Sequence, residues 1–203
     1  MKIIISIIIM NILISTTAPT ALAAEMADYD AADDRAADYL EVMIAAAADG
    51  DTEAGEAAQE ARDMIIDEAA LPCTKISFED LYLTAKIIQS EAGSDWITDE
   101  HQRLVGSVVL NRVDSPEFPD TVHDVVYQRG QYSGTGSGWF AALTPSERAV
   151  RNAAYILEYG SIAPASVVFQ SNFQQGSGVY KTISDNALRC TYFCFSAHTN
   201  LYA

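Results

Sequence analysis

The sequence predicts a mainly α-helical protein with a small β element, and three observations lead to this class. An acidic, alanine-rich stretch near the N-terminus repeats its apolar residues with helical period. Two further apolar segments with the same period flank a short polar junction within residues 81–112. Short apolar and aromatic runs without helical period occur near the C-terminus, at residues 167–169 and 191–195. We therefore expect an acidic helical hairpin followed by a helical domain that contains a small sheet.

The N-terminus has the pattern of a secretory signal peptide. Lys2 precedes an uncharged run over residues 3–14, and small residues follow up to the Ala-Leu-Ala of residues 21–23. We expect cleavage after Ala23 and an exported mature chain, placed outside the cell, in the cell wall or in the periplasm. An uncleaved anchor is the alternative, but the run is shorter than the roughly 20 residues of a membrane span. No stable span is therefore expected in the mature form.

Residues 24–72 hold most of the negative charge. They contain 15 Asp or Glu against Arg35 and Arg62, which gives this segment a charge of −13, while the whole chain carries −16. This balance argues against nucleic-acid binding, which requires clustered Lys and Arg. Helical periodicity on both sides of the Asp-Gly-Asp at residues 49–51 predicts a helical hairpin that ends before Pro72. A partly disordered linker is the alternative, because the apolar stripe is narrow and mostly alanine.

The expected stripe of each hairpin helix follows an i, i+3, i+4 spacing. The first stripe consists of Ala36, Tyr39, Leu40, Met43, Ile44 and Ala47, and the second of Ala54, Ala57, Ala58, Ala61, Met64 and Ile65.

Cys73 opens the main domain, residues 73–203, and the remaining cysteines are Cys190 and Cys194. Three cysteines in an exported chain leave at least one without a partner in the same molecule. We hypothesise a disulfide from Cys73 to Cys190 or Cys194, which would join the two ends of the domain and contribute about 2–4 kcal/mol. A nucleophilic cysteine near His198 is the alternative, but no known local signature surrounds it.

The main domain should begin with two helices. Leu81, Ala85 and Ile88 recur on one face of the first, and Glu91 stands at its end. Thr98 is a suitable N-cap for the second, with acidic residues in its first turn.

A third, short helix is expected up to Tyr127, capped by Asp120, and residues 128–138 should form an irregular surface loop. Thr144 is expected to cap a fourth helix that ends at Gly160, in a capping box with Glu147. Short strands are expected at residues 167–169 and 191–195, with a glycine-containing turn at 176–178.

The residues favour acid chemistry by a carboxylate. The three histidines lie in none of the usual metal-ligand spacings, and the chain has no phosphate loop, nucleotide fingerprint or serine nucleophile elbow, so no metal or cofactor is expected. Glu91 follows an apolar run, and partial desolvation by the helix that carries it would favour its protonated form. The alternative is that Glu91 is an ordinary solvated residue at a helix end. The loop over residues 128–138, with Trp139 and Phe140 behind it, offers polar groups and aromatic faces suited to sugars; the alternative is a solvent-exposed connector.

Five sequence blocks in order carry a resemblance to a known family. They are SEAG (residues 90–93), Glu100 with Gln102, VVLNRV (108–113), SPEFPDTVHDVVY (115–127) and GQYS (130–133). Together they resemble the cell wall hydrolase family typified by the spore cortex-lytic enzyme SleB, over residues 78–173. Three features depart from the family pattern. Gly93 and Ser94 replace the Arg and second Glu of its EARGE block, and two extra residues precede Glu100. Near the C-terminus, Thr191 stands where relatives commonly carry a histidine before an aromatic pair. The resemblance implies a lysozyme-like, mainly helical domain that acts on peptidoglycan glycan strands.

The resemblance also implies roles for individual residues. Glu91 matches the catalytic acid of a lytic transglycosylase, which cleaves the bond between N-acetylmuramic acid and N-acetylglucosamine and leaves 1,6-anhydro ends. Residues expected in the substrate groove are Glu100, Gln128, Gln131, Tyr132 and Asn172. Two alternatives remain open: a hydrolytic muramidase with Glu100 as second carboxylate, and a non-catalytic glycan-binding module. No residue indicates specificity for spore cortex or a protein partner.

Overall fold

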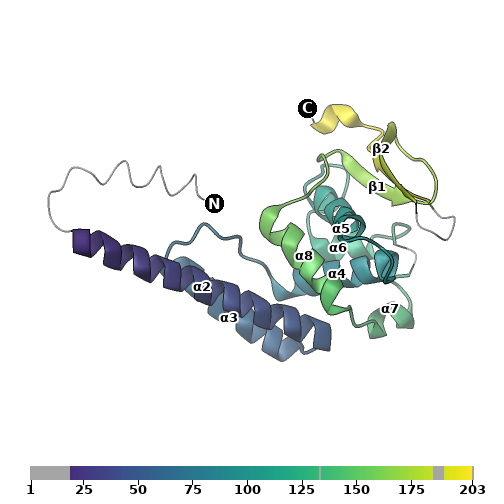
Figure 1. Ribbon diagram of the computed structural model, residues 1–203. Helices are drawn as coiled ribbons and strands as arrows, with labels where there is room; N and C mark the ends of the chain where they lie inside the picture. The colour runs from purple at the N-terminus through teal and green to yellow at the C-terminus, as the bar shows by residue number, and fades with distance from the viewer. Residues whose placement is uncertain (1–18, 133, 185–189, 203) are drawn as a thin grey trace.

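A helical hairpin, a group of helices and a small sheet follow one another along the chain. The computed structural model describes residues 19–132, 134–184 and 190–202. The hairpin and the sheet lie at opposite ends of the molecule, with the remaining helices between them (Figure 1). This arrangement confirms the predicted class, mainly α with a small β element. The predicted signal peptide lies mostly outside the described residues, and the first described helix begins at Pro19.

The hairpin consists of α2 (Pro19–Asp49) and α3 (Thr52–Glu68). The chain reverses at Gly50, whose φ of +73° is accessible mainly to glycine, and the Asp51 carboxylate accepts a hydrogen bond of 3.1 Å from the Ala54 amide. The predicted turn at residues 49–51 is therefore confirmed.

The predicted stripe of α2 is largely correct, since Ala36, Met43, Ile44 and Ala47 are buried, whereas Tyr39 is exposed. The predicted stripe of α3 is wrong by about one position, because Ala57 and Met64 are exposed. The buried residues of α3 are Gly55, Ala58, Arg62 and Ile66. Hydropathy does not reveal which face of a helix is buried when that face consists of small residues. In α3 the buried face is determined by Gly55, which packs against the Phe78 ring, and by Arg62, which is paired with Glu158.

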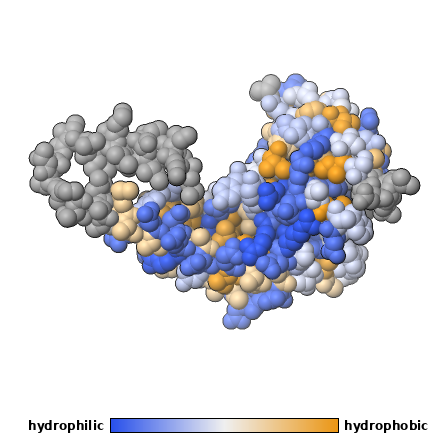
Figure 2. Space-filling model, in the orientation of Figure 1, coloured by the Kyte–Doolittle hydropathy of each residue, from blue (hydrophilic) through white to orange (hydrophobic). Residues whose placement is uncertain are grey.

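The hairpin packs against α4 (Phe78–Ala92) and α8 (Glu147–Tyr159). Its residues Met43, Ile44 and Ala58 belong to the same buried apolar cluster as the helices of the main domain. The surface that faces the viewer over the hairpin and α8 is largely hydrophilic (Figure 2). Among the described helices, none has both the length and the apolar character needed to cross a membrane.

Side-chain caps fix the starts of the central helices. Ser77 caps α4, and Thr98 caps α5 (Asp99–Val113) by accepting a bond of 3.2 Å from the His101 amide, as predicted. The short helix α6 (Val122–Tyr127) is capped by Thr121 and not by Asp120, because the Thr121 hydroxyl accepts the bond from the Asp124 amide. The helix α7 (Gly138–Ala142) was not predicted.

The cap predicted for α8 is wrong. Ser146, rather than Thr144, accepts a hydrogen bond from the Ala149 amide, so the helix begins two residues later than a capping box at Thr144 would require. Its C-terminal end is as predicted, at Gly160 with a φ of +89°.

The sheet contains β1 (Val167–Ser171), β2 (Gly178–Ser184) and β3 (Cys190–Phe195) in the antiparallel order β1-β3-β2. The strands predicted at residues 167–169 and 191–195 are confirmed, and β2 was missed because much of it is polar and exposed. The Asn111 amide of α5 donates to the carbonyls of Pro164 and Val167, which joins the helix to β1.

The predicted disulfide is wrong, since all three cysteines are free thiols. Cys73 packs against the hairpin and bonds to Asp33, whereas Cys190 and Cys194 lie on β3 in the sheet. The hairpin and the sheet are at opposite ends of the molecule, which separates the candidate partners (Figure 1).

Candidate active site

The C-terminal end of α4 presents Ser90 and Glu91. The end of this helix is fixed, because the buried Gln102 side chain donates a hydrogen bond of 2.9 Å to the Ala92 carbonyl. Gly93 follows as the C-cap. Glu91 is thus carried by a rigid helix whose preceding turns, at Ile87 and Ile88, are fully buried.

The opposite wall is formed by the loop after α6 and by α7. The Lys86 ammonium of α4 donates a bond of 3.1 Å to the Ala141 carbonyl and lies 4.9 Å from the centre of the Phe140 ring. The Thr135 hydroxyl donates to the Tyr132 carbonyl over 2.9 Å and closes the loop on itself. Lys86 of α4 therefore holds α7 in place, and α7 is part of the wall opposite the C-terminal end of α4.

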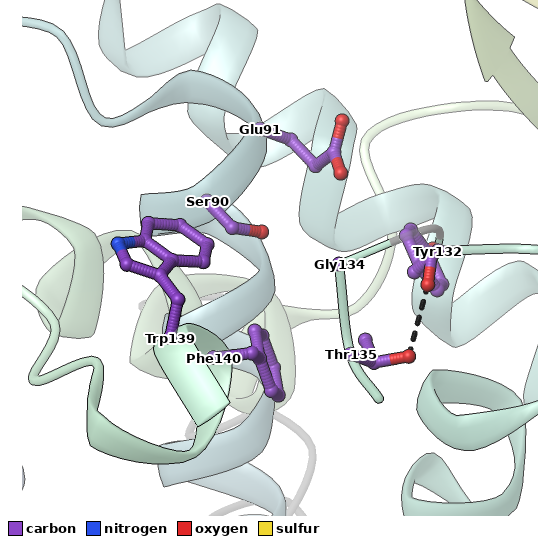
Figure 3. A pocket seen from close by; sticks show the side chains of 7 residues that line it. All are labelled: Ser90, Glu91, Tyr132, Gly134, Thr135, Trp139 and Phe140. Carbon is purple, nitrogen blue, oxygen red and sulfur yellow. Dashed lines mark hydrogen bonds between the residues drawn. The ribbon is translucent and has the colours of Figure 1, made fainter. Parts of the chain in front are cut away.

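Between these walls lies a pocket of about 200 Å³. Its lining residues are Ser90, Glu91, Tyr132, Gly134, Thr135, Trp139 and Phe140. The Glu91 carboxylate points toward the loop that carries Tyr132 and Gly134, and the Trp139 indole lies beside Ser90 (Figure 3). Glu91 is the one carboxylate among the described residues that line this pocket.

Protein surroundings favour the protonated form of Glu91. Desolvation raises the pKa of its carboxyl above the ordinary value, and the positive charge of Arg112 partly opposes this rise. Glu91 is still exposed to solvent, so the rise in its pKa comes from the protein that surrounds the pocket rather than from complete burial. A carboxylic acid in this setting keeps its proton to a higher pH than a solvated glutamate, as a proton donor must.

Tyr132 and Arg112 lie close together beside the pocket. Tyr132 is 6% exposed, and burial raises the pKa of its hydroxyl, with a smaller upward effect from Glu91 and a downward effect from Arg112. The Arg112 guanidinium lies 5.2 Å from the centre of the Tyr132 ring. Glu91, Tyr132 and Arg112 therefore act on one another electrostatically.

The predicted site residues separate into two groups. Glu91 and Tyr132 meet in the pocket. Glu100 lies in the first turn of α5 and forms an ion pair with Lys181 of β2, and Gln128 is the half-buried C-cap of α6. Gln131 and Asn172 are exposed. These four lie outside the pocket lining, and their contact with substrate stays a prediction.

The sequence did not single out Ser90, Thr135 or Arg112 as functional. Arg112 belongs to the VVLNRV block, and a cation in an otherwise apolar helix segment was the signal available for it. Trp139 and Phe140, the apolar surface expected beside the loop, line the pocket. No group of three or more His, Cys, Asp or Glu able to hold a metal ion occurs in the part of the chain that the structure describes.

Comparison with known proteins places part of the chain in a known family model. Residues 98–195 match the family described as cell wall hydrolase. The matched stretch begins after Glu91 but includes Tyr132, Thr135, Trp139 and Phe140 of the pocket. No curated protein and no solved structure matches the chain.

Proposed function

We propose that this protein, whose residues 98–195 match the cell wall hydrolase family, cleaves the glycan strands of peptidoglycan with Glu91 as its catalytic acid. The family match supports an enzyme that acts on peptidoglycan and that works in the cell wall or is exported to it. The bond cleaved joins N-acetylmuramic acid to N-acetylglucosamine, and the reaction is a lytic transglycosylation. The predicted signal peptide agrees with action outside the cell.

One observation carries the proposal: a carboxyl with a raised pKa and an exposed tryptophan line the same pocket. Trp139 is 58% exposed although it lines the pocket, which leaves an aromatic face free for a sugar ring. Glu91 lies outside the matched stretch, but the fold brings it to the wall that this stretch provides. The acid and the family match are therefore linked by the geometry of the pocket.

A single carboxyl is sufficient for this reaction. Protonated Glu91 gives its proton to the glycosidic oxygen as the bond to the muramic C1 breaks. The resulting carboxylate then takes the proton of the muramic C6 hydroxyl, whose oxygen attacks C1 and closes a 1,6-anhydro ring. Glu91 ends the cycle protonated, so no water molecule is consumed and no second acid is required.

Hydrolysis by two carboxylates is the second candidate, with Glu100 as the partner. Retaining and inverting hydrolases hold the two carboxyl groups about 5–5.5 Å and about 6.5–9.5 Å apart, respectively. Glu100 is bound to Lys181 and lies outside the pocket lining, which favours the one-carboxylate route. A non-catalytic glycan-binding module, the third candidate, would have no use for a desolvated carboxyl.

The test is mass spectrometry of the fragments released from purified peptidoglycan by the protein and by Glu91→Gln. Fragments lighter by one water than reducing-end muropeptides, about 18 Da, are expected from the protein, and the variant should be slower by about 10²–10⁴-fold. Reducing-end products would instead establish hydrolysis. Equal activity of the variant, or binding without release of fragments, would refute catalysis by Glu91.

A further inference from the structure

Arg112 is a buried cation without a carboxylate partner in its immediate surroundings. It is 3% exposed, and no carboxylate oxygen of the described residues lies within the 4.0 Å of its guanidinium that defines an ion pair. Arg62, the other buried arginine of the described chain, forms such a pair with Glu158 at 2.8 Å. Burial of an unpaired charge is costly, so the position of Arg112 calls for an explanation.

The guanidinium is nevertheless firmly held. Its Nε donates a hydrogen bond of 2.7 Å to the Val168 carbonyl of β1. It also lies 5.0 Å from the centre of the Phe118 ring and 5.2 Å from that of Tyr132. Helix, strand and two aromatic rings thus fix one positive charge behind the pocket wall, while its Nη1 atom is buried without a hydrogen-bond partner.

The positive charge of Arg112 acts on two residues that line the pocket, Tyr132 and Glu91. Tyr132 lines the pocket, but its hydroxyl oxygen is buried and has no hydrogen-bond partner among the described residues, so the phenol forms part of the wall and does not contact substrate through this atom. Arg112 from α5 is the charged group that acts on the Glu91 carboxyl, and Tyr132 is the titratable group that faces both. The other polar side chains in the lining, Ser90 and Thr135, carry no charge.

We propose that Arg112 is a positioning residue for Glu91. It holds the Tyr132 ring in the pocket wall, and its positive charge stabilises the carboxylate that forms when Glu91 releases its proton. This inference rests on the proposed role of Glu91. Proton donation converts Glu91 into a carboxylate in a desolvated site, and the nearby cation stabilises that carboxylate without contacting substrate. The two influences on Glu91 therefore oppose each other: desolvation favours its protonated form, and Arg112 favours the carboxylate that remains after the proton is transferred.

The sign of the effect is fixed by charge. A neutral residue at position 112 removes the influence that lowers the pKa of Glu91, so that pKa should rise further. Activity of a general acid is lost as pH rises through its pKa, so the alkaline limb of the pH–rate profile should move to higher pH. The maximal rate should fall, by less than the roughly 10²–10³-fold that follows removal of a direct stabilising donor.

The experiment compares Arg112→Gln, Arg112→Lys and Arg103→Gln in the full chain. Gln can still donate to the Val168 carbonyl but carries no charge. Arg103 is the matched control, because it lies on the same helix with its guanidinium 3.8 Å from the centre of the Tyr155 ring and outside the Glu91 pocket. We expect the upward shift in Arg112→Gln alone; an unshifted limb in Arg112→Gln, or an equal shift in Arg103→Gln, would overturn the inference.

Two further measurements test the inference if the protein releases no fragments or if Arg112→Gln does not fold. NMR titration of the Glu91 carboxyl, assigned with Glu91→Gln, should show the same rise even if the protein releases no fragments, so failure of the proposed function and failure of this inference are distinguishable. If Arg112→Gln does not fold, Arg112→Lys decides, because it retains the charge and should keep the Glu91 titration close to that of the unchanged protein. A clear upward shift of the Glu91 pKa in Arg112→Lys would mean that packing around position 112, rather than its charge, determines that pKa.

Discussion

The raised pKa of Glu91 implies a cost to stability that depends on pH. Desolvation raises the pKa of its carboxyl in the folded protein above the ordinary value of 4.5, so the folded state binds the proton more tightly than the unfolded chain. The associated stability is present below the unfolded pKa and is lost as pH rises through the folded pKa. At pH values above the folded-state pKa, the folded protein holds Glu91 as a carboxylate that its surroundings disfavour.

Glu91→Gln should therefore be more stable than the unchanged protein at neutral pH, with the difference vanishing below about pH 4. Thermal melting of both proteins across this range measures it. Glu158, whose pKa is also raised by burial, is present in both proteins and cancels in the comparison. A difference in melting temperature that is constant with pH would contradict the raised pKa.

Trp139 is predicted to bind sugar without supporting the fold. Trp139→Ala should weaken binding of peptidoglycan fragments by about 10-fold, because it removes an exposed aromatic face beside Glu91, and should change the free energy of unfolding by about 1 kcal/mol or less. Titration calorimetry and urea unfolding test the two statements. Trp96→Ala is the matched control, since Trp96 is 62% exposed but does not line the pocket. Equal losses of binding in both variants would remove the case for Trp139.

The candidate site was only partly predictable from sequence. The family resemblance selected Glu91 as the candidate acid, because its position after an apolar helix is a weak signal by itself. Trp139 was noted only as part of an apolar surface beside the glycine-rich loop. Arg112 could not be predicted, since its function depends on which rings and which carbonyl surround it, and these come from segments distant in sequence. The ion pair of Glu100 with Lys181 was equally hard to predict, because Lys181 belongs to a strand that the sequence did not reveal.

At the scale of elements, the contact between the hairpin and α8 includes one buried ion pair. The Arg62 side chain is 2% exposed, donates to Glu158 and to the Thr74 carbonyl at 2.8 Å each, and so joins α3 to the main domain. Arg62→Met should destabilise the protein by about 3–5 kcal/mol, because Glu158 would remain half-buried without its partner. Urea unfolding measures this loss.

Arg151 provides the comparison for Arg62. It binds Glu41 of the hairpin through two hydrogen bonds of 2.9 and 2.8 Å, but both side chains are about half-exposed, so Arg151→Met should cost only about 0.2–1 kcal/mol. A double variant, Arg62→Met with Glu158→Met, should recover part of the loss. Similar losses for Arg62→Met and Arg151→Met would mean that the hairpin is held by its apolar contacts alone.

The elements themselves were more predictable than their boundaries and faces. Helical period located α4 and α5, and the Asp-Gly-Asp turn located the hairpin, because these signals are local. The capping residues of α6 and α8 were misplaced by one and two positions, since Thr121 and Ser146 compete with equally suitable neighbours. The face of α3 could not be deduced, because Gly55 is buried by the shape of the Phe78 ring that it meets.

At the scale of the whole molecule, charge is distributed unevenly. The segment of residues 24–72 carries −13 of a total of −16, and it forms the hairpin at the end of the molecule opposite the sheet. Peptidoglycan with free stem-peptide carboxyl groups is itself anionic. The two should repel each other until salt shortens the range of the interaction.

Initial rates on dilute anionic peptidoglycan should therefore rise several-fold between about 10 mM and about 150 mM salt, as the screening length falls from about 30 to about 8 Å. Peptidoglycan whose carboxyl groups have been amidated is the control and should give a nearly flat salt dependence, because one partner of the repulsion is gone. Rates that fall with salt on the anionic substrate would show that a cationic surface guides binding instead. The arginines at positions 103, 148 and 151, which border a second hollow at the N-terminal ends of α5 and α8, would then be the surface to alter next.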